Sequence, residues 1–312
     1  MTEYDVVTLG HALVDIRFIV DRFVGPDEEA AIIKQTRSVG GSAANVAIDV
    51  SRLGGSAATI IKVGLDGFGR LIIDELMREK VDVSGVKVCL GDTGFTVVII
   101  DREGRVKMYG FKGAAEKLEP GDVDERVISR GKYLHIASLR LDTSLKGAEI
   151  AKKHGLIVSW DPGRRQAQHG LEYYRELLRL IDIVLVNRLE AKYLTGREDY
   201  REASRMIAGM GPSIVVVKRG GDGVYVYDAG NKEEIDLPAF KVPRVVDTTG
   251  AGDAFAAGLL LGLSRGYNLR KAMVYANAVA ALKIMHLGSH HVPSHEEVIR
   301  FIWDYGMLGE FT

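Results

Sequence analysis

The seven residues Asp-Thr-Thr-Gly-Ala-Gly-Asp at positions 247–253 have the composition of a phosphate-binding loop. An apolar run at 255–263 follows and predicts a helix. Gly250 and Gly252 leave backbone N–H groups uncovered at the positive end of that helix, where anions bind. Asp253, in the first turn, is placed to act as a general base that takes a proton from an attacking hydroxyl. The segment therefore predicts phosphoryl-transfer chemistry.

An isolated Gly-Ala-Gly-Asp has a simpler interpretation, in which the glycines form a tight turn and Asp253 caps the helix. We favour the catalytic interpretation because Asp-Thr-Thr precedes the turn and other polar motifs accompany it. The chain contains no G-x-x-x-x-G-K followed by Ser or Thr, which excludes a P-loop nucleotide site. No G-x-G-x-x-G follows a first strand, which argues against a dinucleotide-dependent oxidoreductase.

A second motif has the properties of a site for a ligand with several hydroxyl groups. Gly40 and Gly41 admit close approach of the backbone, and a helix is expected at 46–53. Between them, the amide of Asn45 offers both a hydrogen-bond donor and an acceptor. This combination suits a polyhydroxylated ligand.

Two further motifs follow apolar runs that are expected to be core strands. Asn187 and Glu190 come after one run, and the carboxyl ends of parallel strands are where α/β sheets bind ligands. An amide and a carboxylate there suit a hydrated Mg²⁺, although a helix start also explains the pair. Residues 218–223 (Lys-Arg-Gly-Gly-Asp-Gly) follow another run, and a turn is their simpler explanation when they are taken alone.

The hydrophobic pattern predicts the scaffold that must bring these motifs together. Short β-branched runs alternate with amphipathic stretches, which indicates a parallel sheet covered by helices on both faces. The expected strands are 133–137, 156–160, 183–187 and 214–218. The expected helices are 144–154, 171–180, 251–264, 269–286 and 294–305, the last with a capping-box pattern at Ser294 and Glu297.

Two expected strand pairs break this alternation: 15–20 with 31–36, and 95–101 with 105–111. The second pair is joined by Arg102-Glu-Gly104, a good hairpin turn. Such strands form either a small sheet that covers an active site as a lid or an antiparallel extension of the main sheet. The pattern alone favours neither alternative.

Composition limits the class of protein. A chain of 312 residues with 46% hydrophobic residues fits one large α/β domain. The formal net charge of −1 offers no global basic field for nucleic acid or for an anionic membrane. The single cysteine, Cys89, excludes an intramolecular disulfide framework. The first residues lack a basic region and a long apolar run, and the longest apolar stretch is too short for a membrane span, so we expect a cytoplasmic protein.

The motifs together resemble the ribokinase family, also called the PfkB carbohydrate kinases. The resemblance rests on four motifs in order, over about residues 6–293: Gly40-Gly41 with Asn45, Gly64-Leu-Asp-Gly-Phe-Gly69, Asn187 with Glu190, and 247–253. It implies a doubly wound α/β fold with a mostly parallel sheet, helices on both faces and a small β-sheet lid. Residues 1–312 would then form a single kinase domain, with the lid built from about 12–38 and 93–112.

For ATP and Mg²⁺ the resemblance implies three groups of residues. The base and the anion hole are Asp253 and the amides of Gly250, Ala251 and Gly252. The residues that contact the phosphates and the hydrated Mg²⁺ are Asn187 and Glu190. The residues along the nucleotide are Lys218, Gly220, Gly223 and, beside the adenine, Asn277.

On the acceptor side, the residues that the resemblance places at the substrate hydroxyls are Asp15, Gly40, Gly41 and Asn45. Arg165 belongs to an Asp-Pro-Gly-Arg-Arg segment that is similar to the Asp-x-Asn-x-Arg of fructokinase-like and ketodeoxygluconate kinase-like members, with Gly163 in place of the asparagine. Many members bind a monovalent cation such as K⁺, and the matching positions are Asp247, Thr249 and Gly288.

The resemblance implies an ATP-dependent sugar kinase that phosphorylates a hydroxymethyl group. Ser42 and Ala43 replace the lysine and glycine of typical ribokinases, so strict ribose preference does not follow. Residues 112–115 and the Asp-Pro-Gly segment are similar to archaeal nucleoside kinases of the family, which keeps a nucleoside kinase as the alternative. An alternative of another class is a non-catalytic sensor of sugar or nucleotide. Asp253 argues against it, because a sensor needs no base.

The lid also predicts the oligomeric state. Residues 16–20 and 97–100 are apolar at successive positions, so a small sheet containing them is expected to expose an apolar outer face. Exposed apolar faces and unpaired strand edges favour association. Since several ribokinase-like proteins pair their lids, we expect a homodimer formed through the lid.

Overall fold

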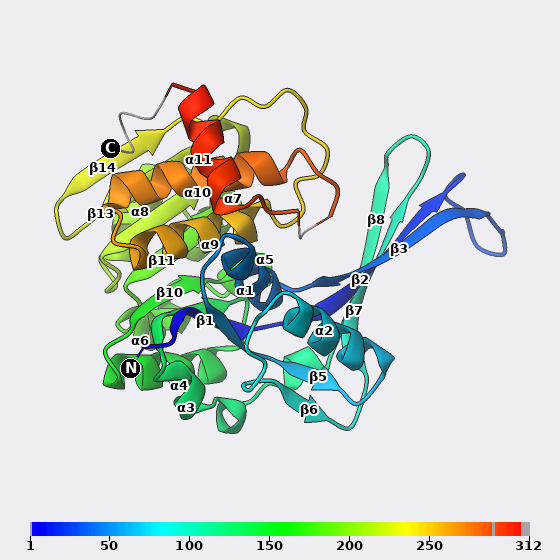
Figure 1. The fold of residues 1–312 in the computed structure, drawn as a ribbon, viewed down its shortest axis with the longest axis horizontal. Coiled ribbons are helices and arrows are strands. Elements are labelled where there is room, and N and C mark those ends of the chain that lie inside the picture. The colour runs from blue at the N-terminus through cyan, green and yellow to red at the C-terminus, as the bar shows by residue number, and fades with distance from the viewer. Residues whose placement is uncertain (1, 289–290, 307–312) are drawn as a thin grey trace.

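An eight-stranded sheet forms the centre of the computed structural model, which describes residues 2–288 and 291–306 (Figure 1). Its strands, in spatial order, are β14 (Glu233–Leu237), β13 (Val224–Asp228), β12 (Ile214–Lys218), β11 (Ile183–Asn187), β10 (Ile157–Asp161), β9 (Gly131–Ala137), β1 (Tyr4–Gly10) and β4 (Ala57–Ile60). The strands from β12 to β4 are parallel, and β13 and β14 add an antiparallel edge. The predicted fold class, a mostly parallel α/β sheet, is confirmed.

Helices cover both faces because successive side chains of each strand point to opposite sides. In β11, Ile183 and Leu185 join one apolar core, and Val184 and Val186 join the other. The helices on the first side are α1 (Ser42–Arg52), α2 (Gly67–Arg78), α9 (Ala251–Ser264), α10 (Leu269–Lys283) and α11 (His295–Asp304). Those on the second side are α3 (Glu125–Ile128), α4 (Leu141–Lys153), α5 (Gly163–Ala167), α6 (Arg175–Leu178), α7 (Arg188–Thr195) and α8 (Tyr200–Ala208).

Most of the expected elements occur at their expected positions. The strands at 183–187 and 214–218 and the helix at 251–264 have the predicted bounds, and Ser294 and Glu297 form the predicted capping box of α11. Short elements complete the fold: β5 (Lys62–Gly64) paired with β6 (Lys87–Cys89), and the 3-10 turns Ala114–Lys117, Pro120–Asp122, Glu172–Tyr174 and Gly220–Asp222.

Two predicted helices were too long. The segment 171–180 forms a 3-10 turn and the short α6, because the buried Tyr174 packs on Trp160 and its hydroxyl donates a 3.1 Å hydrogen bond to the Gln166 carbonyl. Helix α10 ends at Lys283 instead of 286. Its next carbonyl, that of Ile284, accepts hydrogen bonds from the backbone of an incoming loop, which replaces a further helical turn.

A second, four-stranded sheet extends away from the rest of the molecule (Figure 1). We call it the projecting sheet. Its strands, in spatial order, are β3 (Ile32–Gly40), β2 (Leu13–Val20), β7 (Thr93–Ile100) and β8 (Val106–Gly113). Strands β2 and β7 pair in parallel, and the two outer pairs are antiparallel. Because this sheet is separate from the central one, the alternative of an antiparallel extension of the main sheet is wrong.

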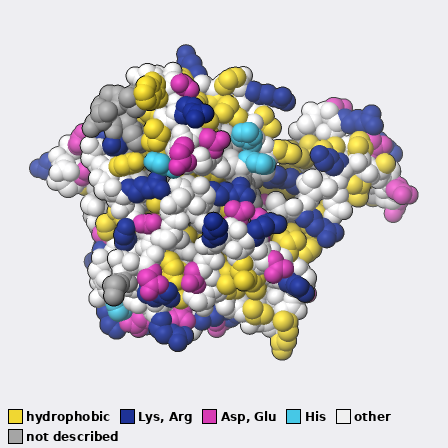
Figure 2. All heavy atoms as spheres, in the orientation of Figure 1, with side chains coloured by type: hydrophobic (Ala, Val, Ile, Leu, Met, Phe, Trp, Pro, Cys, Tyr) yellow, Lys and Arg dark blue, Asp and Glu magenta, His cyan; other side chains and the backbone are white. Residues whose placement is uncertain are grey.

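The apolar side chains exposed on the projecting sheet differ from the predicted ones. Ile16 and Val98, on the two inner strands, are each only 8% exposed. The exposed apolar residues lie on the outer strands and include Ile33 and Met108, which are 51% and 64% exposed. Figure 2 shows hydrophobic side chains among charged ones on this part of the surface. Most of the other apolar residues predicted to be exposed on the inner strands are partly buried, because each inner strand has a neighbour on both sides: Phe18, Ile19, Val97, Ile99 and Ile100.

Among residues 2–288 and 291–306, the structure contains no helix of the length and apolarity that a membrane crossing requires.

Candidate active site

Three charged or polar side chains stand at the carboxyl ends of the adjacent parallel strands β10, β11 and β12: Asp161, Asn187 and Lys218. Asn187 and Lys218 are paired in register, which places them side by side. Lys218 Nζ lies 2.6 Å from Asp161 Oδ2. Asp161 was not predicted to lie on the nucleotide side. The available signal was its position directly after a predicted strand, the same position that pointed to Asn187.

Asn187 and Glu190 form a reciprocal capping box at the start of α7. The Asn187 amide oxygen accepts from the Glu190 N–H at 2.9 Å, and the Glu190 carboxylate accepts from the Asn187 N–H at 2.8 Å. Burial, and then the neighbouring charge of Asp161, raise the pKa of Glu190. Glu190, Asp161 and Lys218 therefore interact as one charged cluster. Its two carboxylates have the chemistry that a partly hydrated Mg²⁺ prefers.

The loop 247–253 leads into the N-terminus of α9, and we call it the anion-binding loop after its predicted role. Gly250 caps α9 with φ of 76°, a left-handed conformation that favours glycine. Gly252 is already helical, and a Cβ on it would lie 3.3 Å from Lys218 Nζ. The amide of Ala251 donates to the Thr248 carbonyl at 3.1 Å, so it is partly used inside the loop. The positive charge of Lys218 thus lies against the N-terminus of α9.

Asp253 occupies the first turn of α9 and contacts α1. Its carboxylate accepts a 2.7 Å hydrogen bond from Asn45 Nδ2. Burial raises the pKa of Asp253 to about 6, and the charge of Asp161 acts in the same direction, whereas the hydrogen bond from Asn45 opposes the shift. A carboxyl group with this pKa is ionised at neutral pH and is basic enough to accept a proton efficiently.

The four predicted acceptor residues lie together. A Cβ on Gly40 would come within 2.5 Å of the Asp15 carboxylate, and one on Gly41, which has φ of 91°, within 2.5 Å of the His11 carbonyl. Position 41 therefore requires glycine, and a side chain at position 40 would displace the Asp15 carboxylate. Asn45 Oδ1 is buried and has no hydrogen-bond partner among the described residues, which leaves an acceptor for a ligand hydroxyl.

Arg165 lies at the margin of this group instead of at its centre. It is exposed on α5 and forms a bidentate ion pair with Glu116 at 3.0 and 3.2 Å. Lys112, near the end of β8, is half-buried, and its ammonium makes no hydrogen bond or ion pair with a described residue. Burial lowers the pKa of Lys112, and charge interactions link it to Glu116, Arg165 and Asp15. Lys112 was not predicted as a site residue, because the interactions that link it to Asp15 and Arg165 join distant segments of the chain.

A cavity of about 710 Å³ lies beside the anion-binding loop. All five residues predicted to contact the nucleotide line it, together with Ala251 and Gly252: Asn187, Lys218, Gly220, Gly223 and Asn277. Asn277 is oriented by a 2.7 Å hydrogen bond from its Nδ2 to the Pro238 carbonyl. The volume and the mixture of apolar wall and polar rim suit an adenine nucleotide.

Asp247, Thr249 and Gly288 are also close together. The Asp247 carboxylate accepts hydrogen bonds of 2.9 Å from the N–H groups of Thr249 and of Gly288. Burial alone would raise the pKa of Asp247, but these hydrogen bonds lower it. Arg17 of β2 and Lys283 of α10 face the same residue: Arg17 Nη1 lies 3.6 Å from the carboxylate, and Lys283 Nζ donates to the Asp247 carbonyl at 2.9 Å.

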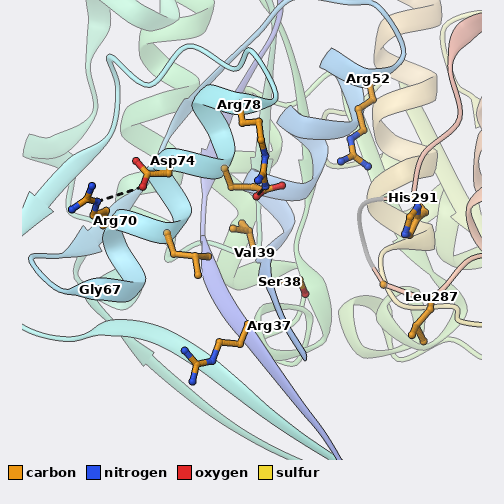
Figure 3. A pocket seen from close by; sticks show the side chains of 13 residues that line it. Arg37, Ser38, Val39, Arg52, Gly67, Arg70, Asp74, Arg78, Leu287 and His291 are labelled. Atoms are coloured by element: carbon orange, nitrogen blue, oxygen red, sulfur yellow. Dashed lines mark ion pairs between the residues drawn. The ribbon is translucent and has the colours of Figure 1, made fainter. Parts of the chain in front are cut away.

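A second cavity, of about 630 Å³, lies between β3, α2 and the segment that contains Leu287 and His291 (Figure 3). Arginines surround it, but several of them are paired with carboxylates. Arg70 lies 3.5 Å from Asp74, and Arg52 pairs with Glu79 at 2.7 Å. Gly288 lines this cavity, and the residues predicted to contact the nucleotide line the other one.

Comparison with known proteins identifies the family. The model of the pfkB family carbohydrate kinases matches residues 4–296. The chain is 35% identical over 298 residues to an ATP-dependent ribose-1-phosphate kinase of Halopiger xanaduensis, which covers 95% of this chain and 97% of that relative. It is 31% identical over 270 residues to a cytidine kinase of Thermococcus kodakarensis, covering 86% and 92% of the two chains.

Solved structures agree with this result. The structure of Arabidopsis thaliana ribokinase complexed with ribose and ATP matches with a TM-score of 0.88 at 25% identity, covering 97% of this chain and 99% of that one. A putative ribokinase II from E. coli in complex with ATP and Mg²⁺ matches with a TM-score of 0.84 at 27% identity, covering 97% and 100%.

Proposed function

The chain belongs to the PfkB family of carbohydrate kinases, and on that premise we propose that it transfers the γ-phosphoryl group of ATP to a hydroxymethyl group of a small sugar. The observation that carries the proposal is the position of Asp253. Its carboxylate accepts a 2.7 Å hydrogen bond from Asn45 of the acceptor motif. Asp253 also lies in the first turn of α9, and the residues just before it, Ala251 and Gly252, line the proposed nucleotide cavity. The base thus lies between the two substrates.

The proposed mechanism uses Asp253 as the general base. Its carboxylate takes the proton of the acceptor hydroxyl while the hydroxyl oxygen forms a bond to the γ-phosphorus. The bond between the γ-phosphorus and the β–γ bridging oxygen breaks, and its electron pair leaves with ADP. The N-terminus of α9 and Lys218 stabilise the negative charge of the transferring group. Mg²⁺, when bound with ATP, neutralises phosphate charge beside Glu190 and Asp161.

We further propose that the projecting sheet acts as a lid within a single kinase domain. Asp15 lies on β2 and Lys112 on β8, so two strands of this sheet bring side chains to the acceptor. Movement of the sheet toward the body would exclude water from the reacting groups.

Within sugars, a specific observation favours an acceptor that already carries a phosphate. Lys112 offers a half-buried ammonium that makes no hydrogen bond or ion pair with any residue of 2–288 or 291–306, and its charge interacts with Asp15 at the acceptor end. The relative from Halopiger xanaduensis, named a ribose-1-phosphate kinase, points to the same class. The cytidine kinase of Thermococcus kodakarensis supports the alternative of a nucleoside acceptor.

An acceptor panel tests these alternatives. The protein would be assayed for ADP release with ATP and Mg²⁺ and, in turn, ribose, fructose, ribose 1-phosphate, fructose 6-phosphate and cytidine. We expect turnover with a sugar, and the highest kcat/KM with a phosphorylated one. A preference for cytidine would favour the nucleoside kinase. Binding of sugar or ATP without ADP release with any acceptor would favour the non-catalytic sensor.

A second measurement isolates Lys112. The substitution Lys112→Gln should raise KM for a phosphorylated sugar at least about tenfold, as expected for the loss of one charge-assisted hydrogen bond. It should change KM for an unphosphorylated sugar little. Equal effects on both classes of sugar would contradict the phosphate-binding role.

We also propose a cytoplasmic homodimer. The exposed apolar side chains on β3 and β8, such as Ile33 and Met108, supply the surface for association. Pairing of two projecting sheets would cover these side chains and the outer strand edges together.

A further inference from the structure

Lys283, the last residue of α10, is a fully buried lysine that the proposed reaction does not use. Its relative exposure is 0%. Its ammonium donates a 2.9 Å hydrogen bond to the backbone carbonyl oxygen of Asp247. Removing an ammonium group from water costs several kcal/mol unless nearby groups compensate for it. The position of Lys283 therefore calls for an explanation.

The charged groups around Lys283 come from four other elements. Asp49 of α1, which is itself fully buried and lacks a hydrogen-bond partner among the described residues, interacts electrostatically with it, as do Asp247 and Asp253. Arg17 of the projecting sheet is the opposing positive charge. Burial and the charge of Arg17 lower the pKa of Lys283, whereas Asp247, Asp49 and Asp253 raise it. Because burial raises the pKa of Asp49 well above its usual range, the carboxylate charge that favours an ammonium here comes chiefly from Asp247 and Asp253.

Asp247 is held through all of its polar groups. Its N–H donates to the Ile284 carbonyl, its carbonyl accepts from Lys283, and its carboxylate accepts from the N–H groups of Thr249 and Gly288. These contacts dock the start of the anion-binding loop on the end of α10. From Asp247 the backbone reaches the base, Asp253, in six residues, so the position of Asp247 constrains the loop and the base together.

The residues at this place do not suit the monovalent cation that the family resemblance implies. Such a cation would need the oxygens of Asp247, but the carbonyl already accepts from Lys283 and the carboxylate faces Arg17 at 3.6 Å. A further positive charge between an ammonium and a guanidinium would be repelled by both.

We propose that Lys283 supplies, from within the chain, the positive charge that holds the loop 247–253 in its phosphate-binding conformation, so that turnover requires no monovalent cation. Lys283 is a positioning residue: it acts on the loop through the Asp247 carbonyl and touches neither substrate. This inference rests on the proposed kinase function, because it assigns the loop its phosphate-binding role.

The first test uses the unmodified protein. Initial rates would be measured with ATP and Mg²⁺ in potassium, sodium or tetramethylammonium chloride at equal ionic strength. Equal rates in the three salts are expected. An increase of tenfold or more in K⁺ over tetramethylammonium would overturn the proposal. This measurement does not depend on the folding of any variant.

The second test removes the charge. Lys283→Met keeps the unbranched chain but removes the terminal ammonium, and displacement of the loop should lower kcat by about 100-fold with little change in the KM of the acceptor. K⁺ should partly restore kcat by entering the vacated position, whereas tetramethylammonium is too large to do so. The control is Lys146→Met, which removes an exposed lysine of α4 and should leave kcat and its ion response unchanged.

A third measurement separates this inference from the proposed function. K⁺ should raise the Tm of Lys283→Met relative to tetramethylammonium, and should not do so for the parent or for Lys146→Met. If no acceptor gives turnover, the kinase proposal fails while the Tm comparison still reports on the cation. Unchanged kcat in Lys283→Met, or a Tm response to K⁺ that the parent shares, would refute the role of Lys283.

Discussion

Asn45 Nδ2 donates a 2.7 Å hydrogen bond to the Asp253 carboxylate, although the two residues are 208 positions apart in the chain. Asn45 belongs to the glycine motif at the start of α1, and Asp253 to the anion-binding turn at the start of α9. Contact between α1 and α9 thus joins the acceptor side of the site to the proposed base.

Replacing the base should abolish most of the turnover. Asp253→Asn retains the shape of the side chain but cannot accept a proton, so kcat should fall by about 10²–10⁴-fold. ATP binding, measured by titration calorimetry, should change little because the nucleotide cavity is intact. A correctly folded variant with nearly normal kcat would show that another group is the base.

The pH dependence of kcat/KM should report the pKa of Asp253. Burial raises this pKa to about 6, and the base acts only when ionised. As pH falls through about 6, Asp253 becomes protonated and kcat/KM should decrease about tenfold per pH unit, whereas above pH 7 this group should impose no further change. The measurement is a profile of kcat/KM from pH 4.5 to about 8.

Asn45→Ala provides the matched variant for that profile. The hydrogen bond from Asn45 lowers the pKa of Asp253, so its removal should move the acid limb of kcat/KM to higher pH. The value of kcat/KM at high pH should also be lower than in the parent, because Asn45 is proposed to bind a hydroxyl of the acceptor. An acid limb that stays in place would contradict the assignment of the limb to Asp253.

A side chain at Gly252 should block the approach of phosphate. Its Cβ would lie 3.3 Å from Lys218 Nζ, so Gly252→Val should displace this ammonium and remove most of kcat. Binding of the acceptor, measured without ATP, should remain. The control is Gly121→Ala, which lies outside the lining of this cavity and has open space around its Cβ. Parent-like turnover in Gly252→Val would refute the anion-binding role of the turn.

The dimer proposal predicts a particle of twice the chain mass of 34.1 kDa in sedimentation at micromolar concentration. The double substitution Ile33→Lys and Met108→Lys places charges on the two exposed outer strands and should give monomers. Lys146→Met, on the body of the molecule, should leave the dimer intact. A monomeric parent, with or without substrates, would rule out association through the projecting sheet.

Much of the site could be predicted from sequence because its signals are local. The turn at 247–253, the strand ends at Asn187 and Lys218, and the glycines before α1 each depend on a few consecutive residue types. Glycine at 250 is required by a positive φ within its own turn, and the capping box at Ser294 and Glu297 lies within one helical turn. Such features hold whatever the surrounding tertiary structure.

Only the tertiary structure decided which charged residues of the site contact each other and which have no partner nearby. Lys218 contacts Asp161, Lys283 contacts the Asp247 carbonyl, and Lys112 has no hydrogen-bond or ion-pair partner in the described part of the chain. None of these relations has a spacing that a sequence pattern can reveal. The exposed apolar side chains of the projecting sheet lie on its outer strands for the same reason, because exposure depends on which strands are neighbours. Burial and Coulomb interactions act through space, so they take their values only when distant segments have been packed together.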